Sequence, residues 1–281
     1  MSATATVSGL YVYPLKGGAA VPLAETEVTA LGFRFDRRWA VVSPTGRVLT
    51  QREHPKLARV HAWITQAGTL GLNVEGEGFD APAPGSGVRE PVRIWSDEVE
   101  AEAYAGAVNE ALSHQLGAPV RLVHFPDDVV RACDPHVAPG ASTAFADGFP
   151  VLVTNEATLV WLDERLVEIG AEPVPMDRFR PNLVIADAPF NAEDEHATLT
   201  VAERVTFQLV SSCTRCLVTT IDQETGEILD DQPLAALRTL RRHPLLKQPI
   251  FGQNAVAKLG PDEHARIRVG DAVRLEGSAA T

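Results

Sequence analysis

Short stretches in the first third of the chain alternate between hydrophobic and polar positions, which is the pattern of half-buried β-strands. Residues Val7–Tyr13 alternate in this way. Arg38–Val42 and Val48–Gln51 flank a turn with proline and glycine, and Val60–Thr65 and Thr69–Val74 flank a second short turn. Each pair is predicted to form a β-hairpin, so we expect the first part of the chain to be rich in strands.

Hydrophobic residues recur at helical spacing in a few places. Ala105–Leu116 and Glu156–Ile169 each carry an apolar stripe, and a shorter helix is predicted at Pro233–Arg242. Two segments without periodicity, 76–87 and 127–149, are predicted to be loops, and the length of the second favours a functional role. Further strands are predicted at Val151–Val153, Asn182–Ile185, Thr198–Val201, Thr206–Val210, Val256–Leu259 and Val273–Leu275. We therefore expect a mixed α+β fold that is rich in strands, with a few peripheral helices.

The composition is that of a soluble globular protein, because 45% of the 281 residues are hydrophobic, 22% are charged and the mean hydropathy is −0.03. No apolar run approaches the roughly 20 residues of a membrane-spanning helix. The first residues lack the basic and apolar regions of a secretion signal. Three cysteines fit a reducing compartment better than a disulfide framework. We therefore expect a cytoplasmic protein with no membrane partner.

The net charge of −12 makes the chain a poor nucleic-acid binder, since neutralising phosphates needs clustered lysines and arginines. Arginines nevertheless gather in two short stretches, at Arg34, Arg37 and Arg38 and at Arg178 and Arg180. They are either solvated surface charges or the lining of a small anion-binding pocket. Their spacing alone leaves both interpretations open.

The segment SSCTRCLVTTIDQETG contains a C-x-x-C pair, Cys213 and Cys216. A zinc site would need further ligands, but the third cysteine is the isolated Cys133 and no paired histidines occur. A thioredoxin-like dithiol would open a helix, whereas residues 217–221 are strand formers. The remaining interpretation is two buried cysteines at a strand edge. Arg215 lies between the two in sequence, and a neighbouring cation favours the thiolate, the form that binds metals.

This segment resembles the signature of the MOSC domain, the C-terminal domain of molybdenum cofactor sulfurases. Three further segments agree with the family in order and spacing. They are Arg178–Ile185 (RFRPNLVI), which precedes the cysteine segment, and Pro249–Asn254 (PIFGQN) and Val269–Val273 (VGDAV), which follow it. Upstream, Tyr13–Lys16 (YPLK) and Asp36–Trp39 (DRRW) resemble the N-terminal β-barrel module that accompanies it. The pattern is similar to that of the amidoxime reducing components and of YcbX-like proteins.

The resemblance implies two β-barrel-like modules. Residues 1–120 would form the MOSC N-terminal module, and residues 121–281 would form the MOSC domain. The two would pack together, with a molybdenum cofactor site at their junction.

The resemblance also implies roles at the metal. Cys216 would be the single protein ligand of molybdenum and a catalytic residue, because a soft thiolate suits a metal that changes oxidation state. Cys213 would be a small buried neighbour on the same turn. Asp147 opens a D-G-x-P turn, 147–150, and would lie on the substrate side of the metal, accepting a proton or orienting an N–OH group. The alternative for Asp147 is an ordinary turn residue.

The cofactor's phosphate and polar pterin would account for the arginines. The family match implies that Lys16 and Arg37 reach the phosphate or the pyranopterin, and that Arg180 and Asn182 hydrogen-bond the pterin. Gly17 stands where the family often has serine, so its backbone N–H would replace a hydroxyl donor. The full set of implied cofactor contacts is Lys16, Gly17, Arg37, Arg180, Asn182, Thr214 and Arg215.

The function implied is a molybdenum-cofactor-dependent oxidoreductase that reduces small N-hydroxylated compounds, N–OH to N–H. The chain has no cysteine cluster for an iron–sulfur centre, so a separate ferredoxin, cytochrome or flavoprotein reductase would supply the electrons. Two alternatives use the same motif. The protein would either carry the cofactor or transfer sulfur without catalysing a reduction, or it would be an interaction module without a metal.

Overall fold

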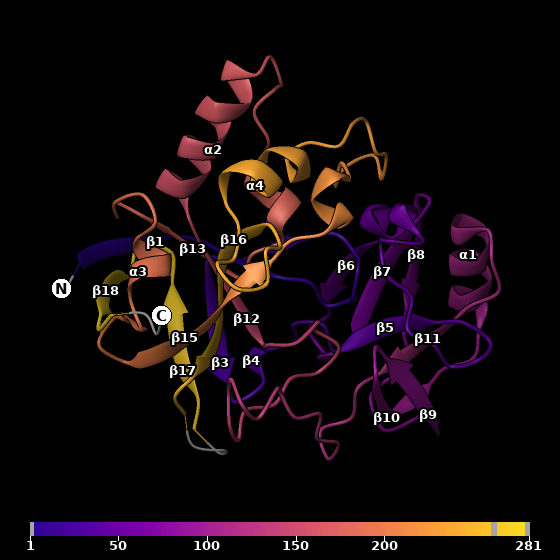
Figure 1. Ribbon diagram of the computed structural model, residues 1–281. Coiled ribbons are helices and arrows are strands. Elements are labelled where there is room, and N and C mark those ends of the chain that lie inside the picture. Colours follow the sequence, from indigo (N-terminus) through magenta and orange to yellow (C-terminus); the bar gives the residue numbers. More distant parts are fainter. Residues whose placement is uncertain (1–2, 260–262, 279–281) are drawn as a thin grey trace.

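The larger part of the molecule is a closed β-barrel. The computed structural model describes residues 3–259 and 263–278. Strand β1 is hydrogen-bonded to both β13 and β18, and this double pairing closes a ring in the order β13-β12-β16-β15-β14-β18-β1. The ring strands are β1 (Ala3–Val12), β12 (Val151–Asn155), β13 (Leu183–Ala186), β14 (Thr198–Val201), β15 (Val205–Thr214), β16 (Ile250–Ala257) and β18 (Ala272–Glu276). Figure 1 shows this barrel on the left.

Alternation along the strands places one face of each in the barrel core. Val7 and Leu10 of β1 pack there with Val153, Ile185 and Phe207, and each of these side chains is almost fully buried. Burying one such side chain stabilises the fold by about 1.5–3 kcal/mol. A β-bulge between Val7 and Gly9 shifts the period-2 pattern that predicted β1, so Val7 and Leu10 both face the barrel interior although they are three positions apart.

Strands from the beginning of the chain complete the barrel part. Strand β2 (Val21–Pro22) pairs with β1, and β3 (Glu25–Thr29) pairs with both β4 (Gly32–Phe33) and β17 (Ala265–Arg268). Residues 3–33 thus pair with strands from the last third of the chain. The expected boundary near residue 120 is crossed by these pairings.

The second part of the molecule has two small sheets and one long helix. The strand order is β5-β11-β10-β9 in the first sheet and β6-β7-β8 in the other. The elements are β5 (Trp39–Val42), the 3-10 helix η1 (Pro55–Arg59), β6 (His61–Ile64), β7 (Leu70–Val74), β8 (Glu77–Asp80), β9 (Val88–Ile94), β10 (Asp97–Ala103), α1 (Ala107–Leu116) and β11 (Arg121–His124). Their own core contains Trp39, Leu57, Leu70, Leu112 and Leu122. Figure 1 shows this part in indigo and purple on the right.

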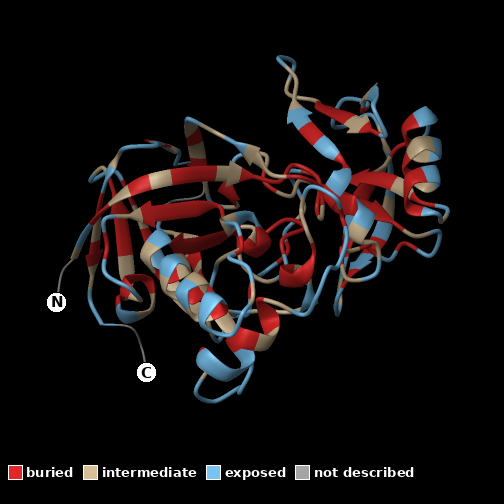
Figure 2. Cartoon of the chain, turned by 90° about the horizontal axis from the view of Figure 1, so that it is seen from above, coloured by how far each residue is buried: buried red, intermediate tan, exposed pale blue. Residues whose placement is uncertain are grey.

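The remaining helices cover one end of the barrel (Figure 1). They are α2 (Glu156–Glu168), α3 (Ala192–Glu195), α4 (Leu234–Leu240) and the 3-10 helices η2 (Met176–Phe179) and η3 (Leu217–Thr220). Helix α2 begins where the side chain of Asn155 accepts a hydrogen bond from the N–H of Ala157. It buries Leu162 and Leu166 and exposes its other face, which Figure 2 shows as alternating red and blue bands.

The strand-rich mixed fold is confirmed, and three local predictions are wrong. Val48–Gln51, expected as the second strand of a hairpin, makes only an isolated bridge between Val48 and Val42. Residues 77–80, expected in a loop, form β8, because the backbone pairs with β7 although the side chains stay largely exposed. Residues 217–220, expected to extend as a strand, form η3. The hydroxyls of Thr219 and Thr220 donate to the carbonyl oxygens of Cys216 and Leu217, which favours the tight turn over the strand. Residues 127–149 have neither helix nor strand, as expected.

A buried histidine makes stability depend on pH. His124 is 5% exposed, and its ring lies 4.9 Å from that of Trp39. Burial, together with the charge of Arg38, lowers the pKa of His124 to about 4. Between this value and the ordinary histidine pKa, the unfolded chain binds a proton that the folded chain excludes, so stability falls as the pH is lowered through that window.

We expect His124 to lower the free energy of unfolding by about 2 kcal/mol when the pH is lowered from 7.5 to 5. Urea unfolding of the wild type and of His124→Gln at both pH values measures this loss. On acidification the free energy of unfolding should fall by about 2 kcal/mol less in the variant than in the wild type. The exposed His114, paired with Glu75, provides the control His114→Gln. Equal pH dependence in the wild type and His124→Gln would contradict the assignment.

Candidate functional site

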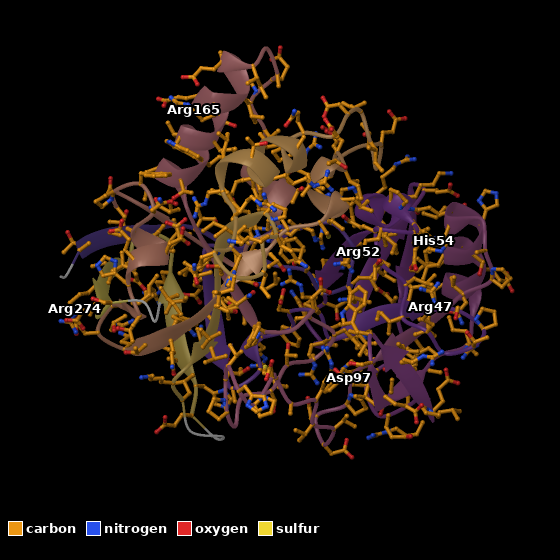
Figure 3. The ribbon with its side chains drawn as sticks, in the orientation of Figure 1. Arg47, Arg52, His54, Asp97, Arg165 and Arg274 are labelled. Atoms are coloured by element: carbon orange, nitrogen blue, oxygen red, sulfur yellow. The ribbon has the colours of Figure 1, made fainter. Side chains whose placement is uncertain are left out.

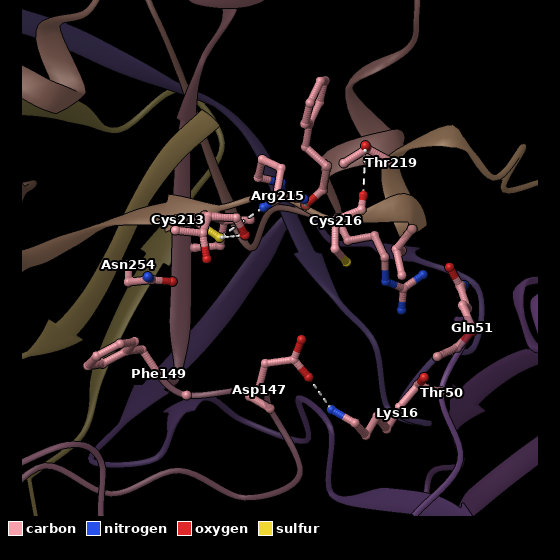
Figure 4. A pocket seen from close by; sticks show the side chains of 18 of the residues that line it. Lys16, Thr50, Gln51, Asp147, Phe149, Cys213, Arg215, Cys216, Thr219 and Asn254 are labelled. Atoms are coloured by element: carbon pink, nitrogen blue, oxygen red, sulfur yellow. Dashed lines mark hydrogen bonds and ion pairs between the residues drawn. The ribbon is translucent and has the colours of Figure 1, made fainter. Parts of the chain in front are cut away.

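A cavity opens where the barrel meets the second part of the molecule. It encloses about 880 Å³ of space free of protein atoms, including its open mouth. The barrel contributes the end of β15 and η3, and the second part contributes residues 50–52. Figure 4 shows Cys213, Cys216 and Thr219 on one side, with Lys16, Gln51 and Asp147 facing them.

All nine predicted site residues line this cavity. They are Lys16, Gly17, Arg37, Asp147, Arg180, Asn182, Thr214, Arg215 and Cys216. They come from five segments of the sequence, and the fold brings these together. Their individual roles toward a cofactor stay predictions.

The cavity is cationic although the chain is acidic. Five basic side chains line it, against the single carboxylate of Asp147: Lys16, Arg37, Arg52, Arg180 and Arg215. Charges of one sign in a cleft with a low-dielectric wall focus the electrostatic potential and attract ligands of the opposite sign. The arginines were expected to be either solvated surface charges or the lining of an anion-binding pocket. Arg37 and Arg180 line such a pocket.

Three motifs interlock around one aromatic ring. The Tyr13 ring lies between two guanidinium groups, with the Cζ atoms of Arg37 and Arg180 at 4.3 Å and 4.2 Å from its centroid. Its hydroxyl donates to the carbonyl oxygen of Pro181 at 3.1 Å. Asp36 accepts hydrogen bonds from the Tyr13 N–H at 2.8 Å and from Arg37 at 2.5 Å. The YPLK, DRRW and RFRPN segments therefore form one rigid wall of the cavity.

Asn182 and Arg180 differ in how their polar atoms are used. The Asn182 side-chain oxygen accepts from Arg37 and from the Leu152 N–H, and its amide donates to the Tyr11 carbonyl, so both ends have protein partners. Arg180 donates to Gln223 at 2.8 Å through one terminal nitrogen. Its other terminal nitrogen is buried and has no partner among the described residues. Burial lowers the pKa of Arg180 to about 10, which leaves it charged at neutral pH.

Lys16 and Asp147 form the central ion pair of the cavity. The Lys16 Nζ donates to Asp147 at 2.6 Å and to the Phe145 carbonyl oxygen at 2.7 Å. Desolvation lowers the pKa of Lys16 against the opposing effect of the carboxylate. For Asp147, desolvation raises the pKa, but the hydrogen bond and charge of Lys16 and the charges of Arg52 and Arg37 outweigh it and hold the pKa well below its usual range. Asp147 is therefore ionised at neutral pH.

Each cysteine of the C-x-x-C pair faces a different arginine. Arg215 donates to the Cys213 Sγ at 2.9 Å, whereas Arg52 donates to the Cys216 Sγ at 3.3 Å. The sequence had indicated Arg215 as the cation beside Cys216, and this assignment is wrong. Cys213 was expected to be buried, but it is half-buried and lines the cavity. The pair lies at the end of β15, where the chain turns into η3 and the two side chains diverge (Figure 4).

Close packing behind the cavity fixes the cysteine segment. Phe179 and Phe251 are fully buried and stacked, with ring centroids 3.8 Å apart. Arg215 donates to the Phe179 carbonyl oxygen at 2.7 Å. Gly252 has φ +76°, and a Cβ there would lie 2.6 Å from the Val153 carbonyl oxygen, so glycine is required next to Phe251. The RFRPN and PIFG segments thereby support the wall that carries the two cysteines.

The sequence reasoning missed several lining residues. They include Thr50, Gln51, Arg52, Phe149, Phe179, Cys213, Thr219 and Asn254. Gln51 and Gln223 exchange hydrogen bonds through their amides at 3.0 Å and 3.1 Å, which joins the second part to the barrel. Residues 50–52 carry no local motif, and only the tertiary structure brings them to Cys216.

Two family models match most of the chain. The model of the MOSC N-terminal beta barrel domain matches residues 4–119, and that of the MOSC domain matches residues 140–274. Mitochondrial amidoxime-reducing component 1 of Homo sapiens is 32% identical over 294 residues, covering 97% of this chain and 83% of that protein. The zebrafish (Danio rerio) protein of the same name is 32% identical over 261 residues, covering 88% and 78%. Mitochondrial amidoxime reducing component 2 of Homo sapiens is 29% identical over 290 residues, covering 95% and 82%.

These names correct one expectation. The relatives are named as mitochondrial proteins, which contradicts the cytoplasmic location inferred from composition and the lack of a secretion signal. Within the part of the chain that the structure describes, no helix is long and apolar enough to span a membrane. The fold, the convergence of the motifs and the similarity over nearly the whole length agree: the chain belongs to the MOSC-domain family of the amidoxime-reducing components.

Proposed function

We propose that the protein is a molybdenum-cofactor-dependent reductase of small N-hydroxylated compounds. The observation that carries the proposal is the half-buried thiol of Cys216, which shares with Cys213 the wall of a cavity lined by five cationic side chains. The names of the relatives, amidoxime-reducing components, support the substrate class.

The residues present fit a phosphorylated, polar cofactor. One terminal nitrogen of Arg180 and the Nε of Arg215 are buried and have no hydrogen-bond partner among the described residues. Such groups cost free energy unless a ligand satisfies them. Within the described residues no three His, Cys, Asp or Glu side chains cluster as a metal site, so ligands other than Cys216 would come from the cofactor itself.

Each part of the cavity has a defined role in this proposal. Cys216 would hold the metal, since thiolates are soft ligands that suit redox-active metals. Lys16 and Arg37 would bind the phosphate, and Arg180 and Arg215 the pterin. Asn182 would act through Arg37, whose guanidinium it positions. Gly17 and Thr214 would complete the contacts from the two sides.

The reaction consumes two electrons and two protons for each N–OH group. The N–O bond breaks, one proton goes to the nitrogen, and the other goes to the oxygen, which leaves as water; the bound cofactor would supply the two electrons. Asp147 is ionised, so its carboxylate would accept the hydrogen bond of the N–OH group and orient it rather than protonate it. The ion pair with Lys16 would keep this carboxylate charged.

The electrons would come from a separate protein. The chain has three cysteines, two of which line the cavity, and these do not suffice for an iron–sulfur cluster. A ferredoxin, a cytochrome or a flavoprotein reductase would therefore dock near the cavity. The small-molecule substrate would enter through the open mouth.

The test is metal analysis followed by an assay. Protein made in a host that synthesises the molybdenum cofactor should contain about equimolar molybdenum, as expected for one cofactor per chain. With a reduced viologen as artificial donor, it should reduce benzamidoxime to benzamidine. Molybdenum without reduction would instead indicate a cofactor carrier or sulfur-transfer protein. Absence of molybdenum would overturn both cofactor-based functions.

A further inference from the structure

Arg52 is a partly exposed cation of the cavity whose ion pair is long. Its Nε lies 3.3 Å from the Cys216 Sγ, and its nearest carboxylate oxygen, on Asp147, is 3.7 Å away. By contrast, Lys16 and Arg37 have carboxylate partners at 2.6 Å and 2.5 Å. The Arg52 side chain is 31% exposed, so it is reachable from solvent. Figure 3 shows Arg52 where the second part of the molecule faces the barrel.

An unusual residue holds this guanidinium in place. Trp95 lies at the two-residue turn between β9 and β10, where Ile94 pairs with Asp97. Its φ is +56°, a left-handed conformation that such turns usually give to asparagine or glycine. Trp95 is 46% exposed, and the Arg52 Cζ lies 4.5 Å from its ring. A bulky aromatic residue in a strained position marks a functional constraint. The Trp95 ring contacts two cavity cations, and Arg52 is the nearer, because the Lys16 Nζ is 5.8 Å from the ring centroid.

The other four cationic side chains of the cavity already have partners or assigned roles, so Arg52 is the one available to bind the substrate. Arg180 and Arg215 carry the buried unpartnered nitrogens assigned to the cofactor, and Lys16 and Arg37 are held in ion pairs. Arg52 alone combines partial exposure with a position beside the metal ligand. A planar guanidinium binds a carboxylate through paired hydrogen bonds.

We propose that Arg52, held by Trp95, makes the enzyme select N-hydroxylated substrates that carry a carboxylate. This inference rests on the proposed function, because it assigns the substrate class of the same site. Arg52 is the specificity-determining residue. Trp95 acts through Arg52 and is a positioning residue.

The test compares two amidoximes of the same shape, 4-carboxybenzamidoxime and its neutral analogue 4-carbamoylbenzamidoxime. We expect the wild type to prefer the carboxylate in kcat/KM by at least about 10-fold, and Arg52→Gln to lose that preference through KM. Arg47→Gln is the matched control, since Arg47 lies on the same part of the molecule, pairs with Glu53 and is outside the cavity (Figure 3). It should keep the preference.

The variant Trp95→Gly tests whether Trp95 positions Arg52 or only stabilises the fold. Glycine adopts the left-handed conformation without strain, so the melting temperature should stay or rise. The preference for the carboxylate should nevertheless fall, because Arg52 loses its platform. A structural role for Trp95 would move the melting temperature down and leave the preference unchanged.

Binding provides a measurement that does not depend on turnover. Calorimetric titration of the cofactor-loaded protein with each amidoxime, without an electron donor, should show tighter binding of the carboxylate in the wild type and equal binding in Arg52→Gln. Equal binding of both compounds by the wild type, or a preference that persists in Arg52→Gln, would overturn the inference. Arg52-dependent binding of the carboxylate without reduction of either compound would instead refute the proposed reaction and leave the assignment of Arg52 standing.

Discussion

Replacing Cys216 by alanine is expected to abolish both molybdenum retention and the reduction of N-hydroxylated compounds. Outer-shell partners of metal ligands typically contribute 10–100-fold to affinity or activity, so removal of the single protein ligand should cost more than about 100-fold. The cavity would keep its five cationic side chains, and the fold should persist because Cys216 is only half-buried. Metal analysis of purified protein and the viologen-coupled assay measure the two effects.

Cys213→Ala is the matched control for this experiment. Cys213 lies three residues earlier and also lines the cavity, but its sulfur accepts from Arg215 and not from Arg52. The variant should retain most of the molybdenum and most of the activity. Equal losses in the two variants would contradict the assignment of Cys216 as the ligand.

Arg37→Gln is expected to lose the cofactor and to destabilise the fold strongly, whereas Arg38→Gln is expected to keep the cofactor and to lose less stability. Arg37 contacts Asp36, Asn182, the Arg180 carbonyl oxygen and the Tyr13 ring. Its removal leaves the Asp36 side chain, which is 2% exposed, without its cationic partner. Breaking a buried ion pair from one side typically costs roughly 3–5 kcal/mol.

Arg38→Gln is the matched control for Arg37→Gln. Arg38 pairs with Asp127, whose side chain is 91% exposed, and it does not line the cavity. Its replacement also removes a hydrogen bond to the Phe125 carbonyl oxygen, so the unfolding free energy should fall by about 1–2 kcal/mol, less than in Arg37→Gln. Urea unfolding gives the stability of each variant, and molybdenum content in the folded fraction gives cofactor binding. Retention of the cofactor by folded Arg37→Gln would show that Arg37 serves the fold alone.

Much of the fold was predictable wherever one face of an element is buried and the other is exposed. β1 and α2 were predicted for this reason. The β9–β10 hairpin was missed, because its strands carry charges and a proline on their exposed positions and its turn has Trp95 in place of glycine. The strand expected after Cys216 was wrong because two threonine hydroxyls favour a turn there.

The candidate site was predictable to the extent that motifs mark it. Nine residues carried by such segments meet in one cavity. Arg52 was not predictable, since it reaches Cys216 across 164 positions of sequence and lies in no motif. The contact of Arg215 with Cys213 was also beyond the sequence, because proximity along a chain does not decide which sulfur a long side chain reaches.

The strand that closes the barrel comes from the first residues of the chain, and this constrains how the protein is synthesised. β1 pairs with β13 and with β18, which is translated last among the ring strands. In a nascent chain, the part of β1 that pairs with β18 therefore stays unpaired until residues 272–276 have left the ribosome. Expression of either half alone would leave an open sheet with unpaired edges, which is prone to aggregate. Chaperone dependence and yield should consequently respond more to changes in β1 than to changes in α1.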